Sequence, residues 1–233
     1  MSQACHPGDD SSGFACERCA AAIPERQAST GQGLCEPCQL SELYTKRLRP
    51  AQRWLWGTLL ASIVANGFKV QALNLALRES PTESTLAIVR GASYCASIAT
   101  FSTMSAWCIW HARTSRFLSS AGKRLTFGPS AAAWFFVPLA GLYKPYQATR
   151  ELWRVSTGER GDSPVSFRVW WFCWVFAALF FPAYLADFLL TNTVPGGSIP
   201  QATTAASWFA LAGASALRVT SHINGATKAL VTP

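Results

Sequence analysis

Two pairs of cysteines near the N-terminus are the residues of this 233-residue chain best suited to chemistry. Cys16 and Cys19 form the first pair, in CERC, and Cys35 and Cys38 form the second, in CEPC, with fifteen residues between Cys19 and Cys35. Two such pairs bring four thiolates together on two tight turns, which is the spacing of zinc ribbons. We therefore predict a structural zinc ion with four filled positions and no open position for water or substrate.

A redox-active dithiol and an iron–sulfur cluster are the alternatives for these thiols, and neither has supporting residues nearby. The N-terminus lacks a basic patch followed by an apolar run, so we expect no cleaved signal peptide and a head that stays in the reducing cytosol. Thiols in that compartment favour metal binding over disulfides. Cys5 and His6 are alternative ligands, in what we expect to be a disordered tail over residues 1–15.

Three charged residues, Lys69, Arg90 and Asp187, lie in otherwise apolar stretches. Ionisable groups inside membrane segments are candidates for transport or proton relay. All three lie towards the outer ends of their stretches, where a long side chain can reach water and a carboxylate can stay hydrated. We therefore favour snorkelling or a structural ion pair, and we expect Asp187 to pair with Arg90 or Lys69.

Residues arranged for catalysis are absent from the sequence. It contains no glycine-rich phosphate loop, no HExxH motif, no nucleophile elbow and no pair of carboxylates at a useful spacing. The histidines, His6, His111 and His222, lie in the tail or near the inner ends of apolar stretches. We predict that the protein is not an enzyme, and a lipid-modifying enzyme has the least support.

Composition divides the chain into a polar head and an apolar body. Half of all residues are hydrophobic and 14% are charged, against about 25% charged in soluble domains. Residues 1–53 are polar, whereas long stretches after Trp54 have almost no charge. We predict a zinc-ribbon-like cytosolic domain over residues 16–45 and a membrane domain over 46–228. The net charge of +8 comes from Lys and Arg beside apolar segments, which favours contact with anionic lipid over nucleic acid.

The membrane domain is predicted to be all-α, with four transmembrane helices over about 54–77, 85–110, 169–190 and 204–219. Lys and Arg number six in residues 1–53 and nine in residues 112–168, against one, Arg78, in the two outer loops. The positive-inside rule therefore places both termini in the cytoplasm. Small residues in the second and fourth spans are expected to pack the bundle.

The stretch WFFVPLAGLYKPYQATRELWRVS, between the second and third spans, begins with an apolar run and continues as a charged amphipathic segment. The apolar run is too short to cross a bilayer, and prolines interrupt the stretch. A fifth span over Ser130–Tyr143 would place five basic residues outside, so we reject it. We predict a re-entrant or interfacial segment over residues 128–156, in which Pro145 starts an amphipathic helix lying in the membrane plane. This helix either binds a ligand or braces the bundle.

The same run carries a recognisable series of residues: a tryptophan-led aromatic stretch closed by proline, a Pro-Tyr-Gln step and a Glu-x-Trp close. These are Trp134, Pro138, Pro145, Tyr146, Gln147, Glu151 and Trp153. The series resembles the bacterial DUF4328 membrane family, over roughly Trp54 to Lys228. The resemblance implies a multi-pass protein of the bacterial inner membrane, without an established activity, to which the cysteine-bearing head is an addition.

Two functions are compatible with these features. The first is a non-enzymatic membrane protein whose zinc-bound head docks a cytosolic protein partner, with the bundle as an anchor or as a responder to lipid. The alternative is a small transporter or channel, acting alone or as a homo-oligomer, that uses Lys69, Arg90 and Asp187. Four spans are few for an alternating-access carrier and no internal repeat is visible, so the first is favoured.

Overall fold

The computed structural model describes residues 16–19, 34–78, 82–137, 140–158, 163–190 and 199–231, and every element in these ranges is helical. The elements are α2 (Glu36–Leu43), a π-helical segment η1 (Tyr44–Leu48), α3 (Arg49–Arg78), α4 (Glu83–Ser120), the 3₁₀ segments η2 (Pro129–Phe136) and η3 (Ala140–Leu142), α5 (Lys144–Thr157), α6 (Val165–Leu190) and α7 (Ile199–Ala229). The predicted all-α class is confirmed over these ranges. The predicted tail lies outside them.

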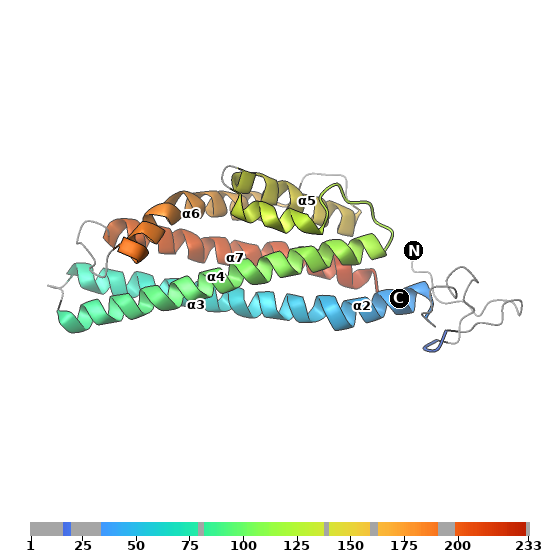
Figure 1. The fold of residues 1–233 in the computed structure, drawn as a ribbon, viewed down its shortest axis with the longest axis horizontal. Helices are drawn as coiled ribbons and strands as arrows, with labels where there is room; N and C mark the ends of the chain where they lie inside the picture. The colour runs from blue at the N-terminus through green and yellow to red at the C-terminus, as the bar shows by residue number, and fades with distance from the viewer. Residues whose placement is uncertain are drawn as a thin grey trace, which may run out of the picture.

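Four long helices, α3, α4, α6 and α7, form an elongated bundle (Figure 1). Helix α3 packs against α4 and α7, and α6 packs against α7. Each predicted span lies within one of these helices. Helix α5 lies along one side of the bundle, towards the end that carries α2, and the end of α7 lies at that same end (Figure 1).

Length and apolar content do not confirm all four predicted transmembrane helices. By length and apolar content, one continuous helix in the described part of the chain, Glu36–Ala76, is long enough to cross a bilayer, and a second apolar stretch, Val165–Phe176, is shorter. Serines and threonines lower the hydropathy of α4 and α7. Several satisfy their hydroxyls within their own helix, as Thr114 Oγ1 does by donating to the Trp110 carbonyl at 2.8 Å and Thr220 Oγ1 to Ala216 at 3.0 Å.

Large hydrophobic side chains lie exposed along the outside of the long helices. On α3 they recur from Trp54, which is 63% exposed, to Val64, which is 71% exposed. The described members within the predicted spans are Trp54, Trp56, Leu60, Val64, Phe68, Leu75, Ile88, Tyr94, Ile98, Phe101, Ile109, Val169, Phe172, Leu179 and Leu211. A surface of this extent is apolar where a soluble bundle would be polar.

Helix α4 continues to Ser120, beyond the predicted end of its span at residue 110. His111, Thr114, Phe117 and Leu118 are buried and recur at intervals of three or four residues. The arginines between them point outward, so this segment is an amphipathic helix that packs on the bundle. Its polar and basic composition hides that periodicity in a hydropathy profile.

Aromatic rings connect the short apolar run to the bundle. Trp107 of α4 stacks on Trp170 of α6 with ring centroids 5.1 Å apart, and Phe135 of η2 meets the edges of Trp107 and Trp174 at 6.3 and 5.5 Å. Trp110 donates its indole N–H to Asn224 Oδ1 of α7 at 3.0 Å. Phe135 therefore packs against the bundle, while Trp134 beside it is 38% exposed.

Gly141 of η3 lies close to the backbone of η2. The Gly141 N–H donates to the Val137 carbonyl at 2.7 Å, and a Cβ at position 141 would lie 3.1 Å from the Trp134 carbonyl oxygen. Because that neighbour is backbone, it has little freedom to move away. A side chain at position 141 would therefore crowd this close approach, which favours glycine.

His111 is fully buried one residue beyond the predicted span 85–110. Neither ring nitrogen has a hydrogen-bond partner in good geometry among the described residues, although the backbone of Ala148 lies close. Burial is the main cause that lowers the pKa of His111 to about 4. The folded protein thus holds a neutral imidazole at a cost in unsatisfied polar atoms.

We expect the free energy of unfolding to fall in acid because of His111. The unfolded chain takes up a proton near the ordinary pKa of about 6.5 and the folded chain does not, so stability is lost between that pH and about 4. The loss is about 3 kcal/mol. Thermal unfolding in detergent should show that His111→Phe raises the thermal midpoint and reduces its decrease between pH 6.5 and pH 4. His222→Gln, at an exposed position of α7, should change neither quantity. If the stability of His111→Phe falls in acid as steeply as that of the unchanged protein, His111 is not the cause of the loss.

Candidate metal centre and helical collar

The four predicted cysteine ligands are brought together at the start of α2. The Sγ atoms of Cys16, Cys19, Cys35 and Cys38 all lie within 4.8 Å of one another, and those of Cys19 and Cys35 are 3.4 Å apart. Four thiolates around one ion at about 2.3 Å would be separated by about 3.8 Å from one another. The donor atoms and their spacing therefore fit a single metal ion bound by four sulfurs.

The second cysteine pair occupies the first turn of a helix. Cys35 is the N-cap of α2 with an extended backbone, and Pro37 follows in the first turn, where its missing N–H costs nothing. Cys38 lies three residues after the cap and so returns to the same side as Cys35. Cys16 and Cys19 lie on a separate turn. The sequence predicted two turns, and the second of them is a helix start.

Backbone amides and burial give the thiols different acidities. The Cys35 N–H donates to Cys16 Sγ at 3.3 Å, and this bond is the largest contribution lowering the pKa of Cys16 to about 6. Burial raises the pKa of Cys38 to about 11. Cys16 is thus a thiolate at neutral pH and ready to bind a cation. All four sulfurs are used by such an ion, so the site suits a structural role better than catalysis.

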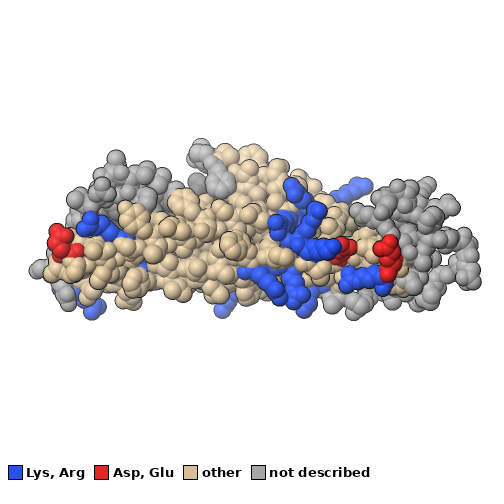
Figure 2. Space-filling view, turned by 60° about the horizontal axis from the view of Figure 1, so that its bottom comes forward, with Lys and Arg blue, Asp and Glu red and all other residues tan. Residues whose placement is uncertain are grey.

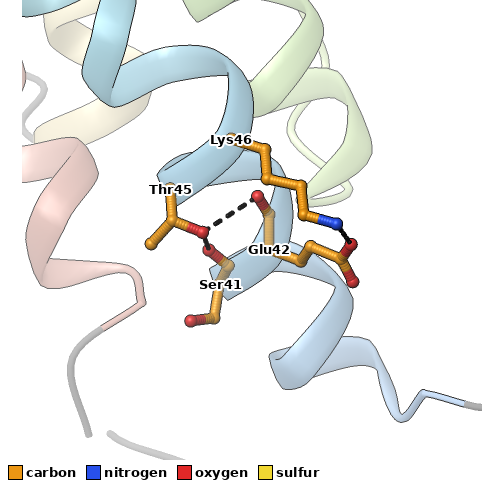
Figure 3. Close-up of polar contacts among 4 residues, drawn as sticks. All are labelled: Ser41, Glu42, Thr45 and Lys46. Atoms are coloured by element: carbon orange, nitrogen blue, oxygen red, sulfur yellow. Dashed lines mark hydrogen bonds and ion pairs between the residues drawn. The ribbon is translucent and has the colours of Figure 1, made fainter.

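The cysteine cluster is joined to the bundle by uninterrupted helix. Helix α2 passes through the π-helical segment η1 into α3, across the predicted boundary between residues 45 and 46. In η1 the Arg49 N–H donates to the Tyr44 carbonyl. Thr45 Oγ1 donates to the carbonyls of Ser41 and Glu42 at 2.9 and 3.1 Å, and Lys46 pairs with the Glu42 carboxylate (Figure 3). The hydrogen bonds of Thr45 engage the carbonyls of Ser41 and Glu42 where the α-helix changes to the π-helical segment.

Three of the six described residues of the family-like series pack α5 against the bundle. Pro145 is buried in the first turn of α5, and Trp153 is buried with its ring 5.7 Å from that of Phe167. The Tyr146 ring lies 5.6 Å from Trp171, and its hydroxyl is 3.5 Å from Ser163 Oγ. The apolar face of α5 is covered by protein. This arrangement is that of a collar around the bundle.

The other members of the series have different surroundings. Gln147 and Trp134 are exposed, and Pro138 lies outside the described residues. Glu151 reaches across to the loop after α4, where Oε1 accepts the Thr126 N–H at 2.5 Å and Oε2 accepts the Phe127 N–H at 2.8 Å. One carboxylate therefore fixes the loop that leads into η2. Helix α5 has the polar and the apolar face expected of an amphipathic helix. On its polar face, Glu151 binds backbone N–H groups of the loop.

The structure describes the side chains of two of the three charged residues of the alternative function, Lys69 and Arg90. Lys69 is 2% exposed, which differs from the snorkelling expected of it, and Arg90 is exposed on α4. The Asp187 side chain lies outside the described set, so its predicted ion pair stays a prediction. Near Lys69, Asn66 donates to Ser62 and to Thr100 Oγ1 at 3.2 Å, a polar bridge between α3 and α4.

Two groups of functional interest were missed from the sequence. Asn224 receives the Trp110 N–H across more than one hundred residues, and a lone asparagine near the chain end gives no sign of this. The basic residues of η1 and α4 indicate topology and contact with anionic lipid in the sequence, but their gathering around one pocket does not follow from it. Their proximity depends on how α4 packs beside α2, which no local spacing reveals.

Comparison with known proteins gives one match. A family model described as "Domain of unknown function (DUF4328)" matches residues 74–223, a narrower range than the resemblance over Trp54 to Lys228. This range includes the collar and leaves out the cysteine cluster, α2 and most of α3. No curated protein and no solved structure matches the chain. The chain belongs to the DUF4328 family, with a cysteine cluster outside the family's range.

Proposed function

We propose that this chain is a multi-pass protein of the bacterial inner membrane whose zinc-bound head docks a cytosolic protein. The observation that carries the proposal is the cluster of four thiols at the end of the continuous helix Glu36–Ala76. Cys35 and Cys38 lie at the N-terminal end of the same continuous helix that is long enough to cross a bilayer. A partner held by the head is thereby held next to the membrane.

The membrane placement is supported by the distribution of side chains on the bundle. Large hydrophobic residues are exposed along the predicted spans, and 39% of the most apolar stretch of the long helix is buried, so most of that stretch faces outward. Lys and Arg gather towards the α2 end (Figure 2). Under the positive-inside rule, that end and both termini are cytoplasmic, and the four long helices are the spans.

Zinc is the ion that best suits the cluster. Four thiolates in a reducing compartment select zinc or an iron–sulfur centre, and a filled tetrahedral site of cysteine pairs is typical of structural zinc. In such a small head the metal replaces the hydrophobic core that the chain lacks. A head folded in this way keeps its surface for contact with another protein. This chemistry supports docking and gives no support to an enzymatic role.

The transporter alternative has weaker support among the described residues. Among the described residues, a cavity inside the bundle measures about 50 Å³ and is lined mainly by apolar side chains, among them Leu59, Trp107 and Phe209. That space holds only a few water molecules. A hydrated ion would need a wider polar path, so docking is the better proposal.

Co-purification tests the docking role. The full-length chain is isolated in mild detergent from its own host, and the proteins that accompany it are identified by mass spectrometry. We expect at least one stoichiometric cytosolic protein that is lost in Cys16→Ser and kept in Cys95→Ser, because Cys95 is an exposed thiol of α4 outside the cluster. An identical set of proteins in the two variants would overturn the docking role.

A further inference from the structure

A basic pocket lies between the π-helical segment and the end of α4, outside the metal centre and the collar. Its volume is about 600 Å³. Lys46 and Arg47 of η1 line one side, and Arg113 and Arg116 of α4 line the other. No Asp or Glu lines the pocket. Phe117 forms part of an apolar floor, so the four cations surround a space partly shielded from water.

The four basic side chains of this pocket differ in the ion pairs and hydrogen bonds that they form within the protein. Lys46 pairs with Glu42, one turn earlier on the same helix. Arg113 donates from Nη1 to the Arg47 carbonyl at 3.0 Å, which fixes its guanidinium at the pocket wall and leaves its other N–H groups. Among the described residues, no carboxylate forms an ion pair with Arg47, Arg113 or Arg116. Three like charges gathered without a counter-charge repel one another unless an anion joins them.

The π-helical segment supplies three consecutive residues of the pocket lining. Lys46, Arg47 and Leu48 follow one another in sequence, and all three line the pocket. In a regular α-helix three consecutive residues spread over about 200° of the circumference. The wider turn brings them closer to one side, and such turns recur at functional sites.

We propose that this pocket binds a phosphate group, supplied by the headgroup of an anionic phospholipid. Arginine presents a planar set of donors that matches two phosphate oxygens at once. Basic pockets at the cytoplasmic ends of membrane helices bind such headgroups. Arg47 lies seven residues before Trp54, about 10 Å along the helix, which places the pocket at the headgroup layer if Trp54 marks the interface. The lipid source rests on the proposed membrane placement, whereas phosphate recognition does not.

Lipid binding by the full-length protein tests this inference. The protein in neutral detergent is titrated with phosphatidylglycerol, with phosphatidylcholine and with soluble glycerol phosphate, and bound molecules are counted by native mass spectrometry. We expect phosphatidylglycerol to bind at least tenfold more tightly than phosphatidylcholine. Arg116→Gln should weaken it about tenfold, and Arg113→Gln with Arg116→Gln should weaken it further. Arg90→Gln removes the same charge from an exposed site at the far end of α4 and should have no effect.

The outcomes separate the possible sources of phosphate. Binding of glycerol phosphate without phosphatidylglycerol would overturn the lipid source. Equal effects of Arg116→Gln and Arg90→Gln would overturn the site itself. Because Arg113 also bonds to backbone, Arg116→Gln is the decisive variant if the double variant misfolds. Cys16→Ser should leave lipid binding intact, so failure of the docking role and failure of this pocket are distinguishable.

Discussion

Replacing Cys38 with serine empties the metal centre of the full-length protein. Metal analysis should give about one zinc per chain before the change and almost none after it, because a hydroxyl is a poor replacement for the fourth thiolate. Metal binding contributes about 10 kcal/mol or more to small cysteine domains. Limited proteolysis should therefore cut the head rapidly. The bundle should keep its thermal midpoint, since its core shares no described residue with the cysteine cluster.

Acidity supplies a further check on the same centre. At pH 7 Cys16, with a pKa of about 6, is deprotonated, whereas Cys38, with a pKa of about 11, must lose a proton to bind metal. Metal uptake therefore releases protons, and the apparent affinity falls as the pH is lowered. Cys95→Ser serves as the matched control. Full zinc content in Cys38→Ser would contradict the four-cysteine site.

Replacing Glu151 with glutamine should release the loop between α4 and η2. The carboxylate accepts two backbone N–H groups, and a carboxamide can accept only with its one oxygen while its NH₂ opposes the second donor. Allowing for partial exposure, we expect a loss of about 2 kcal/mol in the free energy of unfolding. Hydrogen exchange at the Thr126 and Phe127 amides should accelerate by more than tenfold.

Gln147→Ala is the control for Glu151, since Gln147 is exposed one turn earlier on α5. It should leave both the thermal midpoint and the two amides unchanged. If the amides of Thr126 and Phe127 exchange equally fast in the two variants, the carboxylate does not hold the loop. In that case the packing of Trp153 and Tyr146, and not Glu151, holds helix α5 against the bundle.

Local pattern was enough to predict the helices and the clustering of the four cysteines. Apolar runs of about 20 residues indicate helices, and two CxxC pairs place their sulfurs together through turns of fixed size. The amphipathic helix after Pro145 also follows from local spacing. Each of these depends on residues within a few turns of one another.

Contacts between distant segments were beyond such reasoning. Glu151 finds its partners 24 and 25 residues away, and the Trp107 stack on Trp170 joins two predicted spans. The burial of Lys69 depends on which face of α3 meets its neighbours. These features follow from the packing of whole helices, which an apolar profile leaves undetermined.

The unbroken helix from Glu36 to Ala76 also fixes how the cysteine head is rotated around the helix axis relative to the bundle. Its 41 residues extend about 60 Å, and successive residues are offset by about 100° around the axis. A π-helical turn contains one residue more than an α-helical turn. The extra residue in η1 therefore rotates α2 by about 100° around the helix axis relative to α3. The direction in which the cysteine head faces is therefore locked to the direction in which Trp54 and Val64 face. Removing one residue from η1 would turn the head around the axis without altering a single ligand.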